Sequence, residues 1–531
     1  MKNIVTLLAF VLSFTSFAQI TNYHLSLQPE TIAELPGMQS YSVAQHDGEW
    51  LIVGGRIDGL HKRQPFAAFD VPGKNINIYV INPAEKKVYS SNLASLSPSL
   101  SEQLGATNHN FIQHGNHLII TGGYGYSATA LDHKTFNSLI SINVSETISA
   151  IKEGKSFTSQ ISQISDSLFA VTGGRLELLG NTFYLIGGHN FNGRYNPQGP
   201  DHGPGFSQYY TNQIRKFDVS YSPLGFTLQS LETDTNLHRR DYNVVPQIFP
   251  NQIEGVTAFS GVFQPTADLP YLNSVDIKAN SHAVNNTFTQ YYNHYHCATL
   301  PIYDKDNDEM HTFFFGGISQ YFDSSGILTK DDNVPFVKTI ARVTRNSSGQ
   351  MHETKLAEEM PALLGAGAEF ILNPELDLYD NGVVKFENMN QDSIYLGYIF
   401  GGIESTAPNV FFSNATNAST ATNKLLKVYL VKNQTGTAHA LEKRSSSLQF
   451  QIYPNPINDE INTQFYLKDN SNVTFKITDA RGRLIDHFHY ANLPAMWHNK
   501  VLNLPKKLSK GVYYISLKTD FEEITIQVVN N

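Results

Sequence analysis

The chain is poor in cysteine, tryptophan and charge. Its 531 residues include one cysteine, Cys297, and two tryptophans, Trp50 and Trp497. A single cysteine excludes an internal disulfide, so the core must be stable without a covalent cross-link, and we expect a buried, inert thiol. Charged residues make up only 16% of the chain, and the net charge of −9 is not gathered into runs of like sign. We therefore expect neither a nucleic-acid partner nor a polybasic contact with a membrane.

Long apolar runs are missing as well. No stretch beyond the start of the chain approaches about eighteen apolar residues, so we expect no transmembrane segment in the mature chain. At the start, Lys2 precedes a short apolar run from Ile4 to Phe14, and Ser16-Phe17-Ala18 follows it with small residues at the −3 and −1 positions. This pattern is typical of a secretory signal peptide over residues 1–18, cleaved after Ala18.

What the chain does contain is a repeat, an apolar run that ends in two glycines. The doublets are Gly54-Gly55, Gly122-Gly123, Gly187-Gly188, Gly316-Gly317 and Gly401-Gly402. Their first glycines are 68, 65, 129 and 85 residues apart. Because 129 is nearly twice 65, we expect a degenerate sixth copy in that gap, and Val256 to Gly261 ends there in Ser-Gly.

Each copy follows the same plan, in which a strand and a tight turn precede the apolar run, and an irregular stretch and further strands follow the glycines. Four antiparallel strands per repeat are typical of a propeller blade. Glycine suits the crowded end of the second strand, where a side chain would clash and a positive φ is needed. A stacked array of β-sandwiches is the alternative.

The pattern resembles the Kelch family, whose repeats also place two glycines after the second strand. The resemblance covers about residues 20–435, although the tryptophan typical of that family is missing from the repeats and the repeats are longer than usual. It implies an all-β fold, a six-bladed Kelch-like β-propeller over residues 19–433. The sixth copy lacks a fourth strand, so we predict that residues 23–27 pair with Leu425–Leu430 and complete the last blade.

The C-terminal part has a different pattern. Residues 434–447 read as a linker, and residues 448–531 contain short strands and turn signals that predict a small β-sandwich. Its motifs are Tyr453-Pro454-Asn455-Pro456, a turn at Asp479–Gly482, and Gly511-Val512-Tyr513-Tyr514. Together they resemble the type A C-terminal sorting domain of the Bacteroidetes type IX secretion system. The resemblance implies export through that machinery, followed by release or attachment to the outer cell surface; a generic accessory domain is the alternative.

A ligand site is expected where the stretches after the glycines and the connections between blades meet on one face. Candidate ligand-binding residues there are Arg56, His109, His189, Arg239, Arg240, Tyr242, His294, His296 and Glu369. Arginine, histidine and tyrosine around a depression suit an anionic or hydroxylated ligand, such as a glycan or a polypeptide. The same residues also cap loops and pair with one another, which leaves a purely structural role open.

The main hypothesis is a binding module without cofactor or metal, and whether the protein is an enzyme stays uncertain. Two enzyme classes are alternatives. A copper radical oxidase-like enzyme would use tyrosine and histidine ligands and a cysteine cross-linked to tyrosine, residue types found in Tyr295-His296-Cys297, although neighbouring side chains of a strand point to opposite faces. A sialic-acid epimerase-like enzyme would need an acid/base pair, for which Arg240 and Glu369 are candidates. A zinc site at His109, His114 and His117 is disfavoured because these residues flank a tight turn.

Overall fold

The computed structural model describes residues 20–62, 68–195, 205–324, 326–387, 389, 391–413, 417–433, 443–444, 448, 450–453, 457, 461–503 and 508–530. The expected signal peptide over residues 1–18, with its cleavage site at Ala18, lies outside the described residues. So do most of the expected linker and Pro454, Asn455 and Pro456 of the sorting motif. The described part is all-β, as predicted, with short helices only in the connections.

Six sheets, each built around four antiparallel strands, occupy residues 23–432. Strands of the connections extend the second of them to seven strands, and a connecting strand together with β34 (Lys443–Arg444) extends the fifth to six. The first three contain β2 (Ser42–His46), β3 (Glu49–Val53), β4 (Asn77–Asn82) and β5 (Lys87–Asn92); β6 (Thr107–His114), β7 (His117–Ser127), β9 (Ser138–Asn143) and β10 (Ile161–Ser165); and β11 (Arg175–Leu179), β12 (Thr182–Ile186), β15 (Gln213–Tyr221) and β16 (Leu224–Thr233). The next two contain β17 (Asn243–Phe249), β18 (Ile253–Phe259), β19 (Ser274–Lys278) and β20 (Ser281–Asn285); and β21 (Ala298–Asp304), β22 (Glu309–Phe315), β25 (Thr339–Arg345) and β26 (Met351–Glu359).

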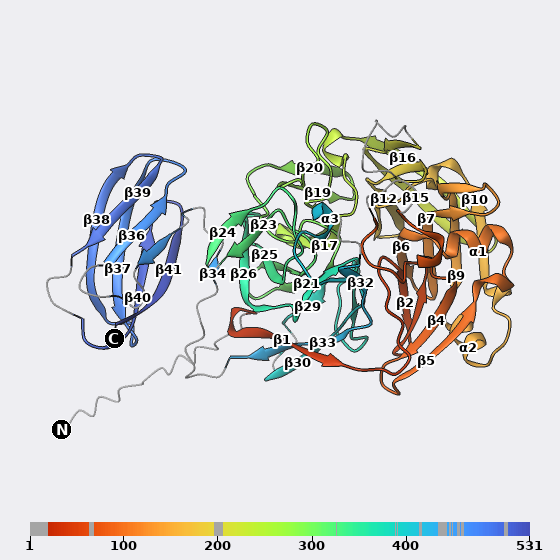
Figure 1. The fold of residues 1–531 in the computed structure, drawn as a ribbon, viewed down its shortest axis with the longest axis horizontal. Helices are drawn as coiled ribbons and strands as arrows, with labels where there is room; N and C mark the ends of the chain where they lie inside the picture. Colours follow the sequence, from red (N-terminus) through yellow and green to blue (C-terminus); the bar gives the residue numbers. More distant parts are fainter. Residues whose placement is uncertain are drawn as a thin grey trace, which may run out of the picture.

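The sixth sheet joins the two ends of this region. It consists of β28 (Glu369–Leu372), β30 (Ser393–Phe400), β33 (Leu425–Lys432) and, at its edge, β1 (Tyr23–Glu30). β1 runs antiparallel to β33 along its whole length, from Tyr23 opposite Lys432 to Glu30 opposite Leu425. The predicted pairing of the N-terminal segment with Leu425–Leu430 is therefore confirmed, and Figure 1 shows the two strands side by side.

The glycine doublets lie where consecutive sheets come closest together. A Cβ on Gly122 would lie 1.7 Å from the carbonyl oxygen of Val171, and its φ of +65° is unfavourable for other residues. The next residue, Gly123, donates its N–H to that same oxygen over 3.1 Å. Equivalent bonds run from Gly55 to Ala106, Gly188 to Arg239, Gly261 to His294, Gly317 to Leu364 and Gly402 to Met38. The bond from Gly402 to Met38 connects the sixth sheet to the segment that precedes the first sheet.

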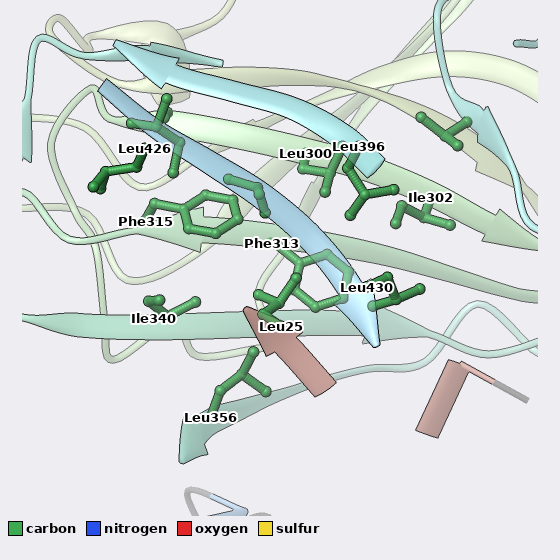
Figure 2. Packing of buried hydrophobic residues seen from close by; sticks show 14 of the residues in the cluster. Leu25, Leu300, Ile302, Phe313, Phe315, Ile340, Leu356, Leu396, Leu426 and Leu430 are labelled. Carbon is green, nitrogen blue, oxygen red and sulfur yellow. The ribbon is translucent and has the colours of Figure 1, made fainter. Parts of the chain in front are cut away.

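Apolar side chains fill the space between each pair of consecutive sheets. Figure 2 shows the cluster between the fifth and sixth sheets, in which Leu25 of β1 packs with Phe313 of β22 and Leu430 of β33. Another cluster joins the sixth sheet to the first, where the rings of Trp50 and Tyr398 meet edge to face with 5.2 Å between their centroids. Each sheet thus has an apolar neighbour on both faces, which explains the near-continuous apolar runs of the central strands.

The connections carry the remaining short elements. They are α1 (Pro98–Leu104), α2 (Val144–Lys152), α3 (Val410–Ser413), β8 (Asp132–Thr135), β13 (His189–Gly193), β14 (Phe206–Tyr210), β23 (Tyr321–Ser324), β24 (Ile327–Lys330), β27 (Leu363–Ala366), β29 (Val384–Lys385), β31 (Ile403–Ser405) and β32 (Ser419–Ala421). Within the described residues, no helix has the length and apolar character needed to cross a membrane.

The C-terminal strands form a separate pair of sheets (Figure 1). One contains β35 (Gln451–Tyr453), β36 (Ile461–Tyr466) and β39 (Trp497–Leu502); the other contains β37 (Ser471–Asp479), β38 (Leu484–Leu493), β40 (Gly511–Lys518) and β41 (Glu523–Asn530). They share one apolar core, in which Phe465 and Phe475 pack with 5.5 Å between ring centroids. Within the predicted linker, β34 (Lys443–Arg444) pairs with β26.

Substitution of Gly122 by alanine should destabilise the protein by about 2–4 kcal/mol, because the new Cβ overlaps the Val171 carbonyl and the backbone is strained. The matched control is Gly115→Ala, since Gly115 also has a positive φ of +56° but no atom within 4 Å of the added Cβ. The free energy of unfolding in urea, followed by the fluorescence of buried Trp50, measures the difference. Equal losses for the two variants would contradict the close approach.

Leu25→Ala should lower the free energy of unfolding by about 2–5 kcal/mol, because Leu25 is only 2% exposed and packs between the fifth and sixth sheets. Ser26→Ala, one residue along on the opposite face of β1, should leave the stability nearly unchanged. The same urea titration compares both variants with the wild type. A loss at Ser26 as large as that at Leu25 would argue against this packing of β1.

Candidate functional site

Six short segments, each leading into the first strand of one sheet, are joined in a closed circuit of backbone hydrogen bonds. The N–H of Ser40 donates to Gly367, Gly367 to His296, His296 to Asp241, Asp241 to Gly173, Gly173 to Asn108, and Asn108 back to Ser40, over distances between 2.8 and 3.3 Å. We call these six the circuit residues. Because each bond links neighbouring segments, the circuit fixes the residues on either side of it.

The residues that precede the circuit residues line the main cavity, which has a volume of about 140 Å³. This is room for on the order of ten water molecules, or for a small organic ligand. The segments contribute Gln39, Thr107, Thr172, Arg240, Tyr295 and Ala366, and the stretches after the glycines contribute Arg56, Tyr124, His189, Ile318 and Ile403. Five of the six stretches that were expected to crowd one face therefore meet at this cavity.

Arg56 lines the cavity as predicted, but its guanidinium is already paired. Nε and Nη2 donate to the two carboxylate oxygens of Asp58 over 2.7 and 2.5 Å, and Nη2 also donates to the carbonyl of Asp70 over 2.8 Å. A bidentate pair of this kind holds the arginine rigidly and neutralises its charge. Arg56 therefore shapes the cavity wall more than it adds free positive charge.

Arg240, another predicted residue, is less completely satisfied. Its side chain is 9% exposed, and its Nε makes no hydrogen bond within the described part of the chain. The nearest carboxylate oxygen, Oδ2 of Asp241, is 3.7 Å from that Nε. The guanidinium lies 5.0 Å from the ring centroid of Phe263 and 5.7 Å from that of Tyr195, which are cation–π distances.

Two histidines of the cavity, His61 and His189, are uncharged at neutral pH. Burial, with the charges of Arg240 and Arg56 adding to it, lowers the pKa of His61 to about 4. Burial and Arg240 likewise hold the pKa of His189 well below its usual value. The side-chain nitrogen of Gln208 lies 2.8 Å from Nδ1 of His189. Because an amide nitrogen can only donate, Nδ1 is the acceptor and the proton of the neutral ring is on Nε2. Neutral imidazoles can donate to and accept from hydroxyl groups.

His296 lines the cavity, and its ring contacts Glu369. Its Nε2 lies 2.9 Å from Oε1 of Glu369 and 3.1 Å from Nη1 of Arg175. Burial works to raise the pKa of Glu369, but His296 and Arg175 outweigh it and lower that pKa. Glu369 is not among the residues lining the cavity. The structure thus brings His296 to the site and places Glu369 as its support.

Four other predicted residues lie outside the main cavity and bond to the backbone. Arg239 is fully buried and donates to the carbonyls of Asn236, Ser260 and Asn273. The hydroxyl of Tyr242 donates to Ile186, Nε2 of His109 to Gln103, and Nε2 of His294 to Gln290. In the four-residue segments Arg239–Tyr242 and His294–Cys297, the two middle residues line the main cavity and the first and last do not.

Sequence reasoning did not single out several residues that line the cavity. They are Ser40, His61, Phe69, Phe191, Tyr195 and Gly367, besides Tyr124 and the small residues of the segments. Aligning the six segments by their distance from the following strand would have identified the circuit residues. The aromatic residues of the long connections have no such regular spacing.

A smaller cavity of about 20 Å³ adjoins the main one. Both are lined by Ser40, Asn108, Asp241 and His296, so these circuit residues form the boundary between them. His109 and Tyr242 line only the smaller cavity. Its volume suffices for one or two water molecules.

The residues considered for a copper site and for a zinc site do not form metal-binding groups in the structure. Tyr295 and His296 both line the cavity because they lie in a bend before β21 and not in a strand as expected. Cys297 faces an apolar cluster with Phe259 and Phe314. Among the described residues, no group of three or more histidine, cysteine or acidic side chains is arranged to hold a metal ion.

The zinc candidates His114 and His117 are bonded to other side chains. Nδ1 of His114 lies 2.7 Å from the hydroxyl of Tyr221, and Nδ1 of His117 lies 3.0 Å from that of Ser141. The third candidate, His109, is buried beside Gln103 as described above. His114 and His117 are register partners at the turn, but the three histidines do not form a group arranged to hold a metal ion.

Comparison with solved structures gives weak similarities. A fungal alcohol oxidase of the AA5 family in complex with copper is 10% identical, with a TM-score of 0.37 over 95% of this chain and 99% of that one. A family 43 arabinoxylan arabinofuranohydrolase from Bacillus subtilis is 9% identical, with a TM-score of 0.28 over 93% and 95%. An exo-β-1,3-galactanase from Phanerochaete chrysosporium is 7% identical, with a TM-score of 0.27 over 80% and 95%. At this level of similarity, fold and activity must be argued from the chain's own residues.

The C-terminal end gives a definite match. No curated protein matches the chain, but residues 451–531 match the model of the secretion system C-terminal sorting domain. The matched range includes Tyr453, in β35, and Gly511, at the start of β40. The expectation of a sorting domain is thus confirmed. The protein is exported by the type IX secretion system and is either secreted or attached to the outer cell surface.

Proposed function

We propose that the protein is a binding module for glycans, delivered to the cell exterior by its C-terminal sorting domain. In this proposal residues 19–433 form a six-bladed Kelch-like β-propeller, residues 434–447 a linker and residues 448–531 the sorting domain. Three observations support six blades around one axis: six sheets built around four antiparallel strands each, six glycine contacts between consecutive sheets, and the closed circuit of hydrogen bonds. The main cavity then lies on that axis.

The main cavity is the observation that carries the ligand assignment. Aromatic rings and hydrogen-bonding side chains are combined in it, as in sites for small hydroxylated molecules. His61 stacks on Phe69 with 4.9 Å between ring centroids, and Tyr195 stands edge-on to His61 at the same distance. Rings of this kind can pack against the apolar face of a sugar, while the imidazoles and Gln39 bond to its hydroxyls.

A carbohydrate-modifying enzyme is the second candidate, favoured by the concave, partly enclosed form of the cavity. An acid/base mechanism needs both groups within reach of the substrate. Of the pair considered for an epimerase-like reaction, Arg240 lines the cavity and Glu369 does not. This arrangement supports binding over catalysis by that pair. A protein or polypeptide ligand would need a larger contact surface than the cavity provides.

Tyr195→Ala in the full-length protein should weaken binding of a glycan identified on an array by about tenfold, because one ring of the cavity wall is lost. Tyr209→Ala is the matched control, since Tyr209 is 68% exposed and is not part of the cavity lining. Calorimetric titration of both variants measures the affinities. Absence of any glycan binding by the wild type, or an equal loss in both variants, would refute the proposed site.

Cys297 should not react with a thiol reagent in the native protein, because burial raises its pKa to about 12 and encloses it in an apolar cluster. After unfolding in urea, one thiol per chain should react. A thiol that stays silent after unfolding would indicate a cross-link to tyrosine. That result, or stoichiometric copper by elemental analysis, would favour the copper radical oxidase-like alternative over the binding module.

A further inference from the structure

The main cavity contains two arginines with different states of pairing. Arg56 forms its bidentate pair with Asp58, so its positive charge is balanced within the wall. Arg240 has no bidentate partner, and its Nε is a buried donor without an acceptor among the described residues. A buried donor left unsatisfied costs about 1–3 kcal/mol, and more when it is charged. Arg240 therefore keeps hydrogen-bonding capacity that no group in the described part of the chain uses.

The surroundings of Arg240 leave it as the principal positive group of the cavity. His189, 3.5 Å from its Nη1, and His61 are both neutral at pH 7 for the reasons given above. Asp241 opposes the arginine charge only in part. Its carboxylate oxygen is 3.7 Å from Nε, its other oxygen lies toward Gly173 of the neighbouring segment, and burial raises its pKa.

We propose that Arg240 anchors the carboxylate of an acidic sugar, so that the ligand of the main cavity is a hexuronic acid residue at the end of a glycan. The inference rests on the glycan-binding function proposed above and specifies its ligand. A planar guanidinium matches the two oxygens of a carboxylate, and its aromatic neighbours keep it desolvated and in place. The rings of Phe69 and Tyr195 would pack against the pyranose, which an inorganic anion cannot offer.

The test compares glucuronate with its methyl ester, which keeps the ring and hydroxyls but loses the charge. Calorimetric titration of the full-length protein should show the acid binding roughly ten to a hundred times more tightly than the ester, as expected for a charged hydrogen bond. The preference should decrease with added salt. Glucose 6-sulfate is a third ligand. If it binds more tightly than glucuronate, the site prefers a sulfate ester and the proposal is wrong.

Two substitutions separate charge from shape. Arg240→Gln should abolish the preference for acid over ester while leaving the affinity for the ester within about twofold, and Arg240→Lys should keep a reduced preference. Lys427→Gln, on β33 outside the cavity, removes the same charge and should have no effect. The comparison within the wild type remains decisive if Arg240→Gln does not fold.

Two outcomes distinguish this proposal from the function on which it rests. If the acid and the ester bind equally well, the cavity binds sugars but Arg240 is not its anion anchor. If glycans bind on an array but none of these monosaccharides binds or competes, the assignment of a uronic acid is overturned while glycan binding stands. If no glycan binds at all, both proposals fall together.

Discussion

Backbone atoms of consecutive sheets approach so closely at the glycine doublets that no side chain fits between them. At Gly122 the neighbouring carbonyl occupies the place that a Cβ would take, and the adjacent Gly123 bonds to that carbonyl. The same contact recurs along the chain and holds each segment against the preceding sheet. With the segments fixed in this way, the N–H and C=O groups of the circuit residues bond to one another. The residues that precede the circuit residues then line the cavity. The site is therefore a consequence of how the sheets meet.

The chemistry of the cavity comes from the difference between neighbours in one segment. Arg239 and Arg240 are adjacent in sequence but differ in their partners. Arg239 donates its hydrogen bonds to backbone carbonyls, whereas Arg240 lines the cavity and lies over an aromatic ring. Burial, with the charge of Arg240 adding to it, keeps His61 and His189 neutral. Arg56 is neutralised by its bidentate pair with Asp58, whereas the nearest carboxylate oxygen to Nε of Arg240 is 3.7 Å away, so Arg240 is the less neutralised of the two cavity arginines.

Sequence patterns predicted the arrangement of strands better than the direction of side chains. The spacing of the glycine doublets located all six repeats, including the degenerate one at Gly261, and the missing last strand led correctly to β1. Of the predicted ligand-binding residues, Arg56, His189, Arg240 and His296 line the cavity, and their binding role stays a prediction. His294 and Tyr242 do not, because side-chain direction depends on position within segments that are not regular strands. Nor could the sequence show that Asp58 neutralises Arg56, a contact made by the folding of a long loop.

The pairing of β1 with β33 has a consequence for how the chain is made. Leu25 is synthesised early, whereas Leu430, its partner in the sheet, is made only after nearly the whole region. A contact between residues so distant in sequence forms slowly. Until Leu425–Lys432 has been made, β1 lacks its partner strand, and an unpaired strand with an exposed edge is the kind of segment through which chains aggregate.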